Sequence, residues 1–397
     1  MAQLSDRLNR LAPSATLAMS QKSNEMKAQG IDVINMSVGE PDFNTPEHIK
    51  AAGKKAIDDN YSKYSPVPGY LALRNAISDK LDKENHLQYN NKEIIVGTGG
   101  KQGVCNSILA LVNPGDEVII PAPYWVSYPQ MVKLAGGTPV IIRASFEQNF
   151  RITAKQLEEA ITPKTKMLIL CSPSNPTGSV YSQEELNELA KVVLSHEDLF
   201  VLSDEIYEHI NYIGKSASIA SYPGMKERTI ICNGVSKAYA MTGWRLGWVA
   251  APEWIVKGIN KLQGQYTSGT CDVSQMAALA AYQSSQECVE DMRKAFEKRR
   301  DLIVGLAREI PGLEVNVPEG AFYLFPKCSS FFGKSDGKTV ISNSTDFAMY
   351  LLQEGHVATV GGDAFGDPDC FRMSYATSDD NIKEAMRRIK EVTARLK

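Results

Sequence analysis

The sequence of 397 residues has no apolar run long enough to cross a membrane. Such a run needs about 18 consecutive apolar residues, and none occurs between the two ends of the chain. The first residues, MAQLSDRLNRLAPSAT, alternate polar and apolar side chains and lack the apolar stretch of a secretory signal. We therefore expect a protein without a membrane partner.

Cysteine and histidine patterns typical of metal sites are also missing. The seven cysteines include no CxxC pair, and the five histidines form no HxxxH pair. An odd number of widely spaced cysteines favours free thiols in a reducing compartment. The sequence thus predicts a cytoplasmic protein without a metal site.

Positively and negatively charged residues are nearly balanced in number. Lysine and arginine number 43 and aspartate and glutamate 46, which gives a net charge of −3. No global field would attract nucleic acid, so we expect no nucleic-acid partner, and any bound anion must be held by a local site.

A dinucleotide-binding fingerprint is absent as well. The stretch GTGGKQG (97–103) would need a third glycine where Gln102 stands. This argues against a nicotinamide-dependent dehydrogenase, although Gly99 and Gly100 before a helical pattern could still form a phosphate-binding turn or only a tight turn.

What the sequence does contain is a regular alternation of apolar strand-like runs and helical patterns. The length exceeds what one hydrophobic core usually fills, and near-continuous apolar runs between helices are typical of a mostly parallel sheet covered on both faces. The expected strands are 93–98, 117–122, 138–143, 166–172, 199–204, 229–236 and 246–251. The expected helices between and after them are 101–112, 124–135, 182–196 and 253–266.

A second, smaller α+β domain is expected beyond this alternation. Residues 287–310 have the pattern of one long connecting helix, and a closing helix is expected at 381–396. Shorter strand-like runs lie at 313–318, 321–326 and 370–376. We expect a large domain over 46–286, with 1–45 and 287–397 forming an N-terminal segment and the small domain.

Polar residues gather where the expected strands end, which is where parallel sheets bind ligands. Asp204 ends one apolar run and needs a cationic partner if it is buried, although a helix N-cap is an alternative role. Lys237 ends another run, and a desolvated lysine suits a Schiff base. Arg245 follows and suits a phosphate. A single lysine is usually a solvated surface residue, but the combination of these residues at strand ends favours a functional role for Lys237.

These residues stand among motifs that are spread over nearly the whole chain. The motifs are PSAT (13–16), GEPDFNTPEH (39–48), KYSPVPGYLALR (63–74), GGKQ (99–102), NPGDEV (113–118), PYWVSYP (123–129), SPSNPTG (172–178), SDEIYEH (203–209), SKAYAMTGWRLG (236–247), GAFY (320–323) and RMSYA (372–376). In these motifs the chain resembles the class I aminotransferases, which are pyridoxal-phosphate enzymes of fold type I, and among them the bacterial aspartate aminotransferases of subgroup Ib.

The resemblance implies an α/β PLP-dependent transferase fold of type I, with a mostly parallel seven-stranded sheet and a smaller α+β domain. The implied cofactor is pyridoxal 5′-phosphate (PLP). Lys237 resembles the lysine that forms the Schiff base with PLP and moves the proton. Asp204 resembles the partner of the pyridine nitrogen. Tyr207, which we expect near the start of a helix, resembles the donor to the 3′-oxygen. The further cofactor-binding residues that the resemblance implies are Gly100, Lys101, Gln102, Trp125, Asn175, Ser236 and Arg245.

For the substrate, Arg372 resembles the arginine that binds the α-carboxylate, with Asn175 and the backbone of Gly39 assisting. The substrate-binding residues implied in addition are Lys101, for a distal carboxylate, and Trp125. We also expect Thr16 near the substrate mouth. Tyr64 resembles a tyrosine that a partner subunit contributes to the phosphate, so the resemblance implies a homodimer.

We therefore expect an aspartate aminotransferase that uses L-aspartate and 2-oxoglutarate. A preference for alanine or aromatic amino acids is the alternative within the family, and a PLP-binding regulator is disfavoured because no basic patch is present. Some members of the subgroup also accept prephenate and carry a lysine just before PSAT. Ala12 stands there in this chain, which argues against that activity.

Overall fold

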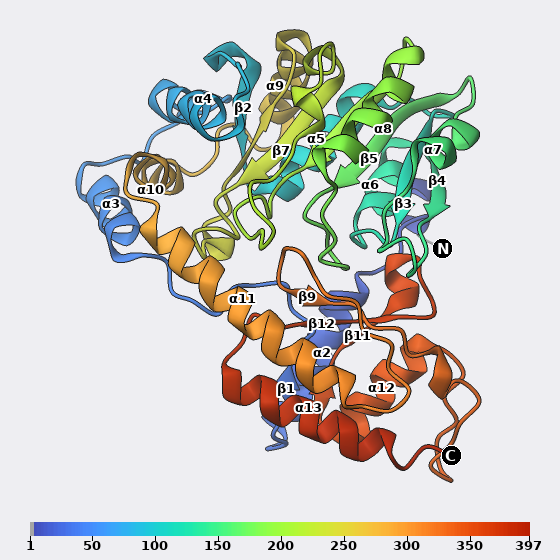
Figure 1. Ribbon diagram of the computed structural model, residues 1–397. Helices are drawn as coiled ribbons and strands as arrows, with labels where there is room; N and C mark the ends of the chain where they lie inside the picture. Colours follow the sequence, from blue (N-terminus) through green and yellow to red (C-terminus); the bar gives the residue numbers. More distant parts are fainter. Residues whose placement is uncertain (1–3) are drawn as a thin grey trace.

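The computed structural model describes residues 4–397 and has a larger upper and a smaller lower part (Figure 1). Helix α11 (Glu287–Arg308) leads from one part to the other. The upper part contains a seven-stranded sheet between helices, and the lower part contains the C-terminal helices and short strands. The expected fold class is confirmed, whereas the exact domain boundaries at residues 45/46 and 286/287 stay a prediction.

The large sheet has the strand order β2-β8-β7-β6-β5-β3-β4. Strand β8 is antiparallel to both of its neighbours, and the remaining pairs are parallel. The strands are β2 (Ile94–Gly97), β3 (Glu117–Ala122), β4 (Thr138–Arg143), β5 (Thr165–Cys171), β6 (Phe200–Asp204), β7 (Thr229–Gly234) and β8 (Gly247–Ala250). All seven lie at the positions that the sequence predicts.

The central strands are apolar throughout because both faces of the sheet are covered. In β5, Met167 and Ile169 pack into a cluster on one face, and Leu168 and Leu170 pack into another cluster on the opposite face. Each of these side chains is at most 3% exposed. A period-two alternation of polar and apolar residues is therefore absent, as expected for strands buried on both sides.

Helices cover the large sheet and build the small domain. Apolar side chains of α5, α6 and α9 share one cluster with the sheet, and those of α7 and α8 share another. The helices other than α11 are α1 (Asp6–Asn9), α2 (Ala15–Ala28), α3 (Glu47–Asp58), α4 (Leu71–Asn85), α5 (Gly100–Leu111), α6 (Tyr128–Ala135), α7 (Ala154–Ala160), α8 (Gln183–Ser195), α9 (Glu253–Tyr266), α10 (Asp272–Gln283), α12 (Ser344–Gly355) and α13 (Asp379–Thr393).

The small domain contains two short sheets. Strand β1 (Ile34–Asn35) pairs in parallel with β10 (Val357–Ala358), so this part of the N-terminal segment lies on the small domain. The second sheet has the order β11-β12-β9, and its strands are β11 (Val360–Gly361), β12 (Phe371–Ser374) and β9 (Tyr323–Leu324).

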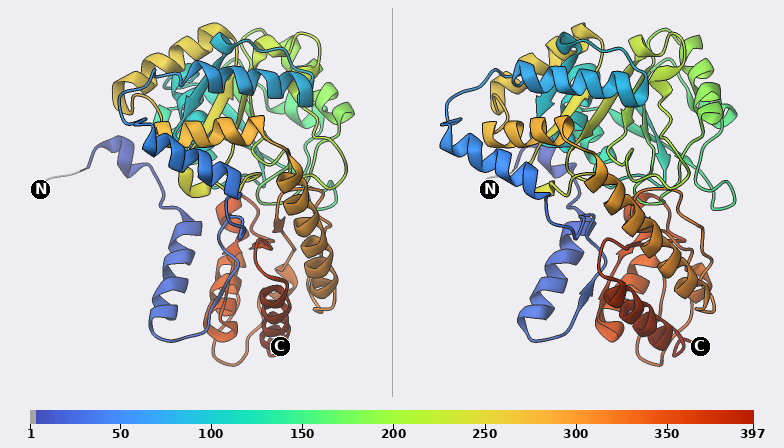
Figure 2. Two further views of the ribbon diagram at one scale, coloured as in Figure 1. Left: turned by 90° about the vertical axis from the view of Figure 1, so that its left-hand side faces the viewer. Right: turned by 60° about the vertical axis from the view of Figure 1, so that its left-hand side comes forward.

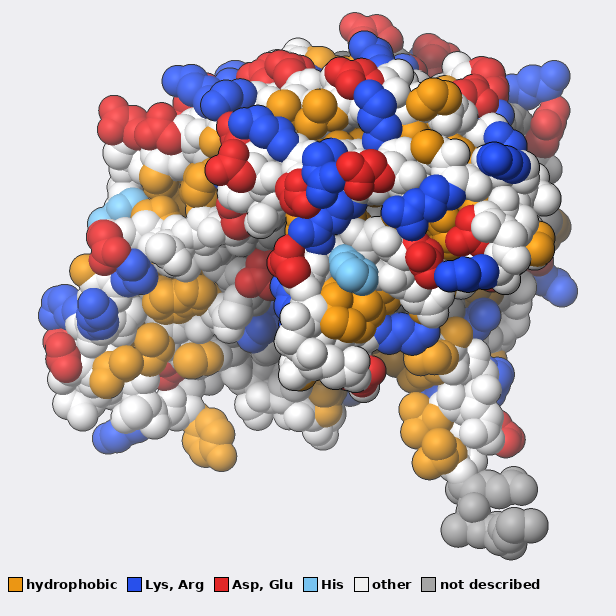
Figure 3. Space-filling model, turned by 90° about the horizontal axis from the view of Figure 1, so that it is seen from below, with side chains coloured by type: hydrophobic (Ala, Val, Ile, Leu, Met, Phe, Trp, Pro, Cys, Tyr) orange, Lys and Arg blue, Asp and Glu red, His pale blue; other side chains and the backbone are white. Residues whose placement is uncertain are grey.

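Helix α1 lies at the outside of the molecule, beside α6 (Figure 2). Leu4, which precedes α1, is 68% exposed, and Leu8, within α1, is 49% exposed. Seen from below, hydrophobic side chains lie uncovered on the segment that leads to the N-terminus (Figure 3). Within residues 4–397, no helix is both long and apolar enough to span a membrane.

Two glycines, Gly247 and Gly234, let backbone segments touch at the end of the sheet nearest the site. A Cβ atom on Gly247 of β8 would lie 2.2 Å from the backbone nitrogen of Gly100, and one on Gly234 of β7 would lie 2.7 Å from the Cα of Gly247. No side chain fits these gaps, so glycine is required there for contact rather than for a positive φ angle.

Two local expectations are wrong. Residues 313–318 form no strand, because they pair with a neighbour only at Glu314, opposite Lys327, and Pro318 lacks an N–H to donate. Tyr207 does not begin a helix. Residues 206–209 form turns, in which Glu208 N donates to Glu205 O and Ile210 N to Tyr207 O, each only three residues away.

Candidate active site

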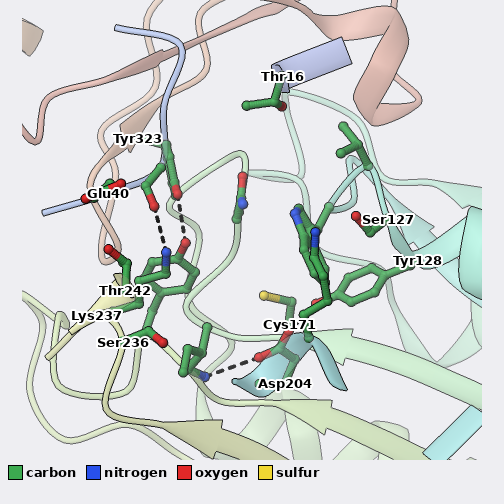
Figure 4. A pocket seen from close by; sticks show the side chains of 18 of the residues that line it. Thr16, Glu40, Ser127, Tyr128, Cys171, Asp204, Ser236, Lys237, Thr242 and Tyr323 are labelled. Atoms are coloured by element: carbon green, nitrogen blue, oxygen red, sulfur yellow. Dashed lines mark hydrogen bonds between the residues drawn. The ribbon is translucent and has the colours of Figure 1, made fainter. Parts of the chain in front are cut away.

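A cavity of about 280 Å³ opens at the carboxyl ends of β5, β6 and β7. Figure 4 shows Asp204 and Ser236 on its sheet side, with Thr16, Glu40 and Tyr323 approaching from the opposite side. The cavity is thus enclosed between the large sheet and segments of the small domain, which is where ligands bind in parallel α/β sheets.

Most of the residues singled out from the sequence line this one cavity. They are Thr16, Gly39, Gly100, Lys101, Trp125, Asn175, Asp204, Tyr207, Ser236, Lys237, Arg245 and Arg372. Two others do not. The Gln102 side chain accepts from Thr98 N and donates to Thr267 Oγ1 instead, and Tyr64 is fully exposed on this chain. The roles of these residues stay predictions.

The Lys237 amine points into the cavity and donates to the backbone oxygen of Gly39 at 2.6 Å. Burial lowers the pKa of Lys237 from its ordinary value to about 8, and the positive charge of Arg372 acts in the same direction. The nearby Glu40 carboxylate opposes this shift. About a tenth to a fifth of such an amine is neutral, and therefore nucleophilic, near pH 7, far more than of an ordinary lysine.

Asp204 is 7% exposed at the end of β6. Its Oδ2 accepts from the Tyr128 hydroxyl at 2.6 Å and its Oδ1 from Ile206 N at 3.3 Å. Burial raises the pKa of Asp204, and these two donors oppose that rise. In the described part of the chain no cation lies within 4 Å of the carboxylate, so the charge that its burial calls for must come from a ligand.

Arg372 of β12 is 2% exposed. It donates to Asn175 Oδ1 at 2.8 Å and to Ser37 O at 2.5 Å, and its Nε has no partner. Its guanidinium lies over the ring of Tyr323, 4.6 Å from the centroid. Among residues 4–397 it has no ion pair with a carboxylate, so this buried cation is suited to bind an anionic group from outside the chain.

An anion could also bind at the start of α5. Gly99 has φ +81° and Gly100 begins the helix, whose free N–H groups point toward the cavity end. A Cβ atom on Gly99 would lie 2.5 Å from Arg245 Nη2, so the guanidinium lies directly against this turn. Ser236 lines the same end of the cavity. This arrangement is typical of phosphate-binding sites.

Aromatic side chains complete the cavity wall. The Lys101 amine lies 5.0 Å from the centroid of the Trp125 ring, and burial lowers the pKa of Lys101. The Tyr207 hydroxyl is hydrogen-bonded to the Tyr323 hydroxyl at 2.7 Å. Burial, with Tyr323 adding to it, raises the pKa of Tyr207 well above its ordinary value, so the phenol stays protonated and able to donate.

Sequence reasoning missed several lining residues, and most of them stand inside motifs that it had recognised. Tyr128 belongs to PYWVSYP, Tyr323 to GAFY, Glu40 to GEPDF and Thr242 to SKAYAMTGWRLG. Cys171 ends β5 and carries no such signal. Within residues 4–397, no group of three or more histidine, cysteine, aspartate or glutamate side chains is arranged to hold a metal ion.

The fold and the site together define a class of enzyme. The family model "Aminotransferase class I and II" matches residues 31–389, and the chain belongs to this family.

Particular relatives cover the whole chain. The aspartate/prephenate aminotransferase of Cereibacter sphaeroides is 48% identical over 100% of both chains. The crystal structure of the aspartate aminotransferase from Rhizobium meliloti has a TM-score of 0.97 at 43% identity and covers 100% of both chains. The Thermus thermophilus aspartate aminotransferase with maleate has a TM-score of 0.93 at 39% identity, covering 99% of this chain and 100% of that one.

Proposed function

We propose that this aminotransferase is a PLP-dependent aspartate aminotransferase, which converts L-aspartate and 2-oxoglutarate to oxaloacetate and L-glutamate by a ping-pong mechanism. The observation that carries the proposal is the buried guanidinium of Arg372, which has a free Nε and faces the same cavity as Lys237 and Asp204. The names of the relatives support aspartate as the donor.

The residues present fit PLP. Asp204 is a buried carboxylate without a cation, which suits a protonated ring nitrogen. The start of α5, Ser236 and Arg245 suit the phosphate, and Trp125 would lie against the face of the ring. When bound, the cofactor supplies an aldehyde for covalent attachment and a ring that accepts electrons released at the substrate Cα.

The residues of the chain would orient the substrate and move its proton. Arg372 and Asn175 would bind the α-carboxylate and fix the Cα relative to the Lys237 amine. With a pKa near 8, that amine can take the proton from the substrate Cα and would deliver it to the carbon through which the cofactor is attached. Tyr207 would donate to an oxygen on the cofactor ring.

We propose that Lys101 binds the distal carboxylate of aspartate or glutamate. Its amine reaches the cavity beside Trp125. Replacing it with alanine should then lower kcat/KM for aspartate about ten-fold or more while leaving kcat/KM for alanine nearly unchanged. Equal losses for both donors would make Lys101 a residue of the phosphate turn only.

We also propose a cytoplasmic homodimer. All seven cysteines are free thiols, which agrees with a reducing compartment. Tyr64, Leu4 and Leu8 are exposed on a single chain, and a second copy could cover them. In that dimer Tyr64 would reach the phosphate of the partner's cofactor.

The near-ultraviolet and visible absorbance spectrum of the purified protein tests the function. The cofactor band should change on addition of L-aspartate and return on addition of 2-oxoglutarate. A band that responds to alanine or phenylalanine but not to aspartate would contradict the donor assignment and leave the family unchanged. No band, even after PLP is supplied, would contradict the role of Lys237.

Prephenate is a second candidate substrate, because the Cereibacter relative is named for it. Ala12 argues against it. The backbone nitrogen of Ala12 donates to Gln130 Oε1, and a methyl side chain offers no charge to a second carboxylate. An assay with prephenate and L-aspartate decides this point, and Ala12→Lys is the informative variant.

A further inference from the structure

Tyr128, the first residue of α6, makes the strongest contact to the buried carboxylate of Asp204. The two oxygen atoms are 2.6 Å apart, and Tyr128 is 2% exposed. Burial raises the pKa of Tyr128 well above its ordinary value, so the hydroxyl is protonated and donates. A short bond from a neutral hydroxyl to a carboxylate is among the stronger hydrogen bonds in proteins.

No other group in the described chain can replace this donor. Ile206 N donates to the other carboxylate oxygen at the longer distance of 3.3 Å. Lys237 acts on Asp204 only through its charge, because its amine is bonded to Gly39 O. The remaining titratable groups facing Asp204 are the thiols of Cys171 and Cys232, and burial raises the pKa of both.

The ring of Tyr128 makes a second contact that points to the same site. It meets the Trp125 ring edge to face, with centroids 5.3 Å apart and an interplanar angle of 87°. The backbone reinforces this arrangement, because Tyr128 N donates to Trp125 O at 3.0 Å. Tyr128 therefore contacts both the Asp204 carboxylate and the Trp125 ring, and all three residues line the cavity. Figure 4 shows Tyr128 beside Asp204.

We propose that Tyr128 is a positioning residue of the cofactor site, which aims Asp204 at the ring nitrogen, keeps it ionised and fixes Trp125 against the ring face. The proposal rests on the proposed function. It assigns to Tyr128 two tasks that a buried tyrosine of the core would not have. Its hydroxyl serves Asp204, and its ring serves Trp125.

The test is equilibrium binding of PLP to the apoenzyme over a range of pH. Tyr128→Phe keeps the ring and removes the hydroxyl. We expect the Kd for PLP to rise about ten-fold or more at neutral pH. We also expect the loss of binding at acid pH to begin at a higher pH, because Asp204 without its donor protonates more readily.

Tyr181→Phe is the matched control. Tyr181 is a buried tyrosine of the large domain whose hydroxyl accepts from Ile152 N at 2.8 Å. Its replacement removes a buried hydrogen bond without touching Asp204. We expect it to affect unfolding while leaving the Kd for PLP and its acid limb as in the unaltered protein.

A double variant separates positioning from general destabilisation. If Tyr128 acts through Asp204, adding Tyr128→Phe to Asp204→Asn should change the Kd for PLP much less than Tyr128→Phe does alone. An undiminished effect in the double variant, or an unchanged Kd and acid limb in Tyr128→Phe, overturns the proposal. If the unaltered protein fails to bind PLP, the proposed function falls as well, and the two failures are thereby distinguished.

Discussion

The surroundings of Arg372 indicate that it binds an anion. A guanidinium that is 2% exposed, with one nitrogen unpartnered, is costly unless an anion completes it. Asn175 and Ser37 hold two of its nitrogens from different parts of the chain, so its position is fixed before any ligand arrives. Because the guanidinium is already held in place, it loses little conformational entropy when it binds a carboxylate.

Replacing Arg372 with alanine should raise the KM for aspartate about 100-fold, because a charge-assisted pair with the α-carboxylate is lost. Steady-state kinetics with aspartate and alanine as donors measure this. Both donors should suffer, since both carry an α-carboxylate. Arg143→Ala, which removes an exposed partner of Asp367, is the control. Unchanged kinetics in the Arg372 variant would contradict the assignment.

The lowered pKa of Lys237 has a consequence for cofactor incorporation. Only the neutral amine attacks an aldehyde, and burial brings the pKa to about 8. The rate at which the apoenzyme incorporates PLP should therefore rise with pH and level off above a midpoint near 8. Stopped-flow absorbance measures this rate. A midpoint near the ordinary lysine value of 10.5 would show that the amine is not desolvated.

Sequence reasoning was reliable for residues with a charge or an unusual position and less so for neutral ones. Asp204, Lys237 and Arg372 line the cavity as expected. The expected cationic partner of Asp204 is the ring nitrogen of the cofactor, but the sequence did not predict that the Tyr128 hydroxyl would also donate to this carboxylate. Tyr128 stands in the recognised motif PYWVSYP, but the motif alone does not separate a tyrosine that contacts the site from an ordinary aromatic residue of the core.

At the scale of elements, a buried ion pair connects α4 with the turn that carries Tyr207. Lys80 of α4 pairs with Glu208, which also accepts from Asn85 and, at 2.6 Å, from Asn233 of β7. Burial alone would raise the pKa of Glu208, but Lys80 and its other partners lower it to about 2. The pair thus ties a helix, a turn and the strand leading to Lys237.

Lys80→Met should lower the free energy of unfolding by about 3–5 kcal/mol, because it leaves the Glu208 carboxylate buried without a cation. Urea unfolding of the holoenzyme measures this. Adding Glu208→Gln should restore part of the loss, since the uncompensated charge is removed. Breaking the exposed pair of Lys191 and Glu188 by Lys191→Ala should cost far less, because solvent screens its charges. Equal losses for the two pairs would contradict this account.

The elements themselves were predictable to different degrees. The seven strands of the large sheet could be found because burial on both faces makes them continuous apolar runs. The short strands of the small domain could not be bounded, since β9 spans only Tyr323–Leu324 and 313–318 forms no strand. Helix α4 was not expected at all. Charged residues stand between its apolar ones and obscure the helical pattern. One of them, Lys80, is buried because it pairs with Glu208.

At the scale of the whole molecule, Tyr64 is separated from the cavity that it is expected to serve. Its side chain is fully exposed on the single chain, while the loop behind it is anchored to α10. Gln275 of α10 donates to Ser65 Oγ at 3.3 Å and accepts from Tyr70 N at 2.9 Å. A residue on an anchored loop that faces outward is well placed to reach a second copy.

Mixing two inactive variants tests this arrangement. Lys237→Ala and Tyr64→Ala subunits should each form impaired homodimers. In a hybrid dimer, one of the two sites would regain both intact residues, and random mixing should restore about a quarter of the full activity. Activity that stays at the sum of the separate variants, despite hybrids seen by native mass spectrometry, would contradict a shared site.

The contact of Gly247 with Gly100 has a bearing on how this sequence can diverge. A single methyl group at 247 would collide with the backbone that opens α5, so the position tolerates no alternative although it performs no chemistry. A screen of all substitutions scored by growth would rank Gly247 with Lys237. Intolerance to substitution in such a screen reports the spacing of main chains as faithfully as it reports reactive groups.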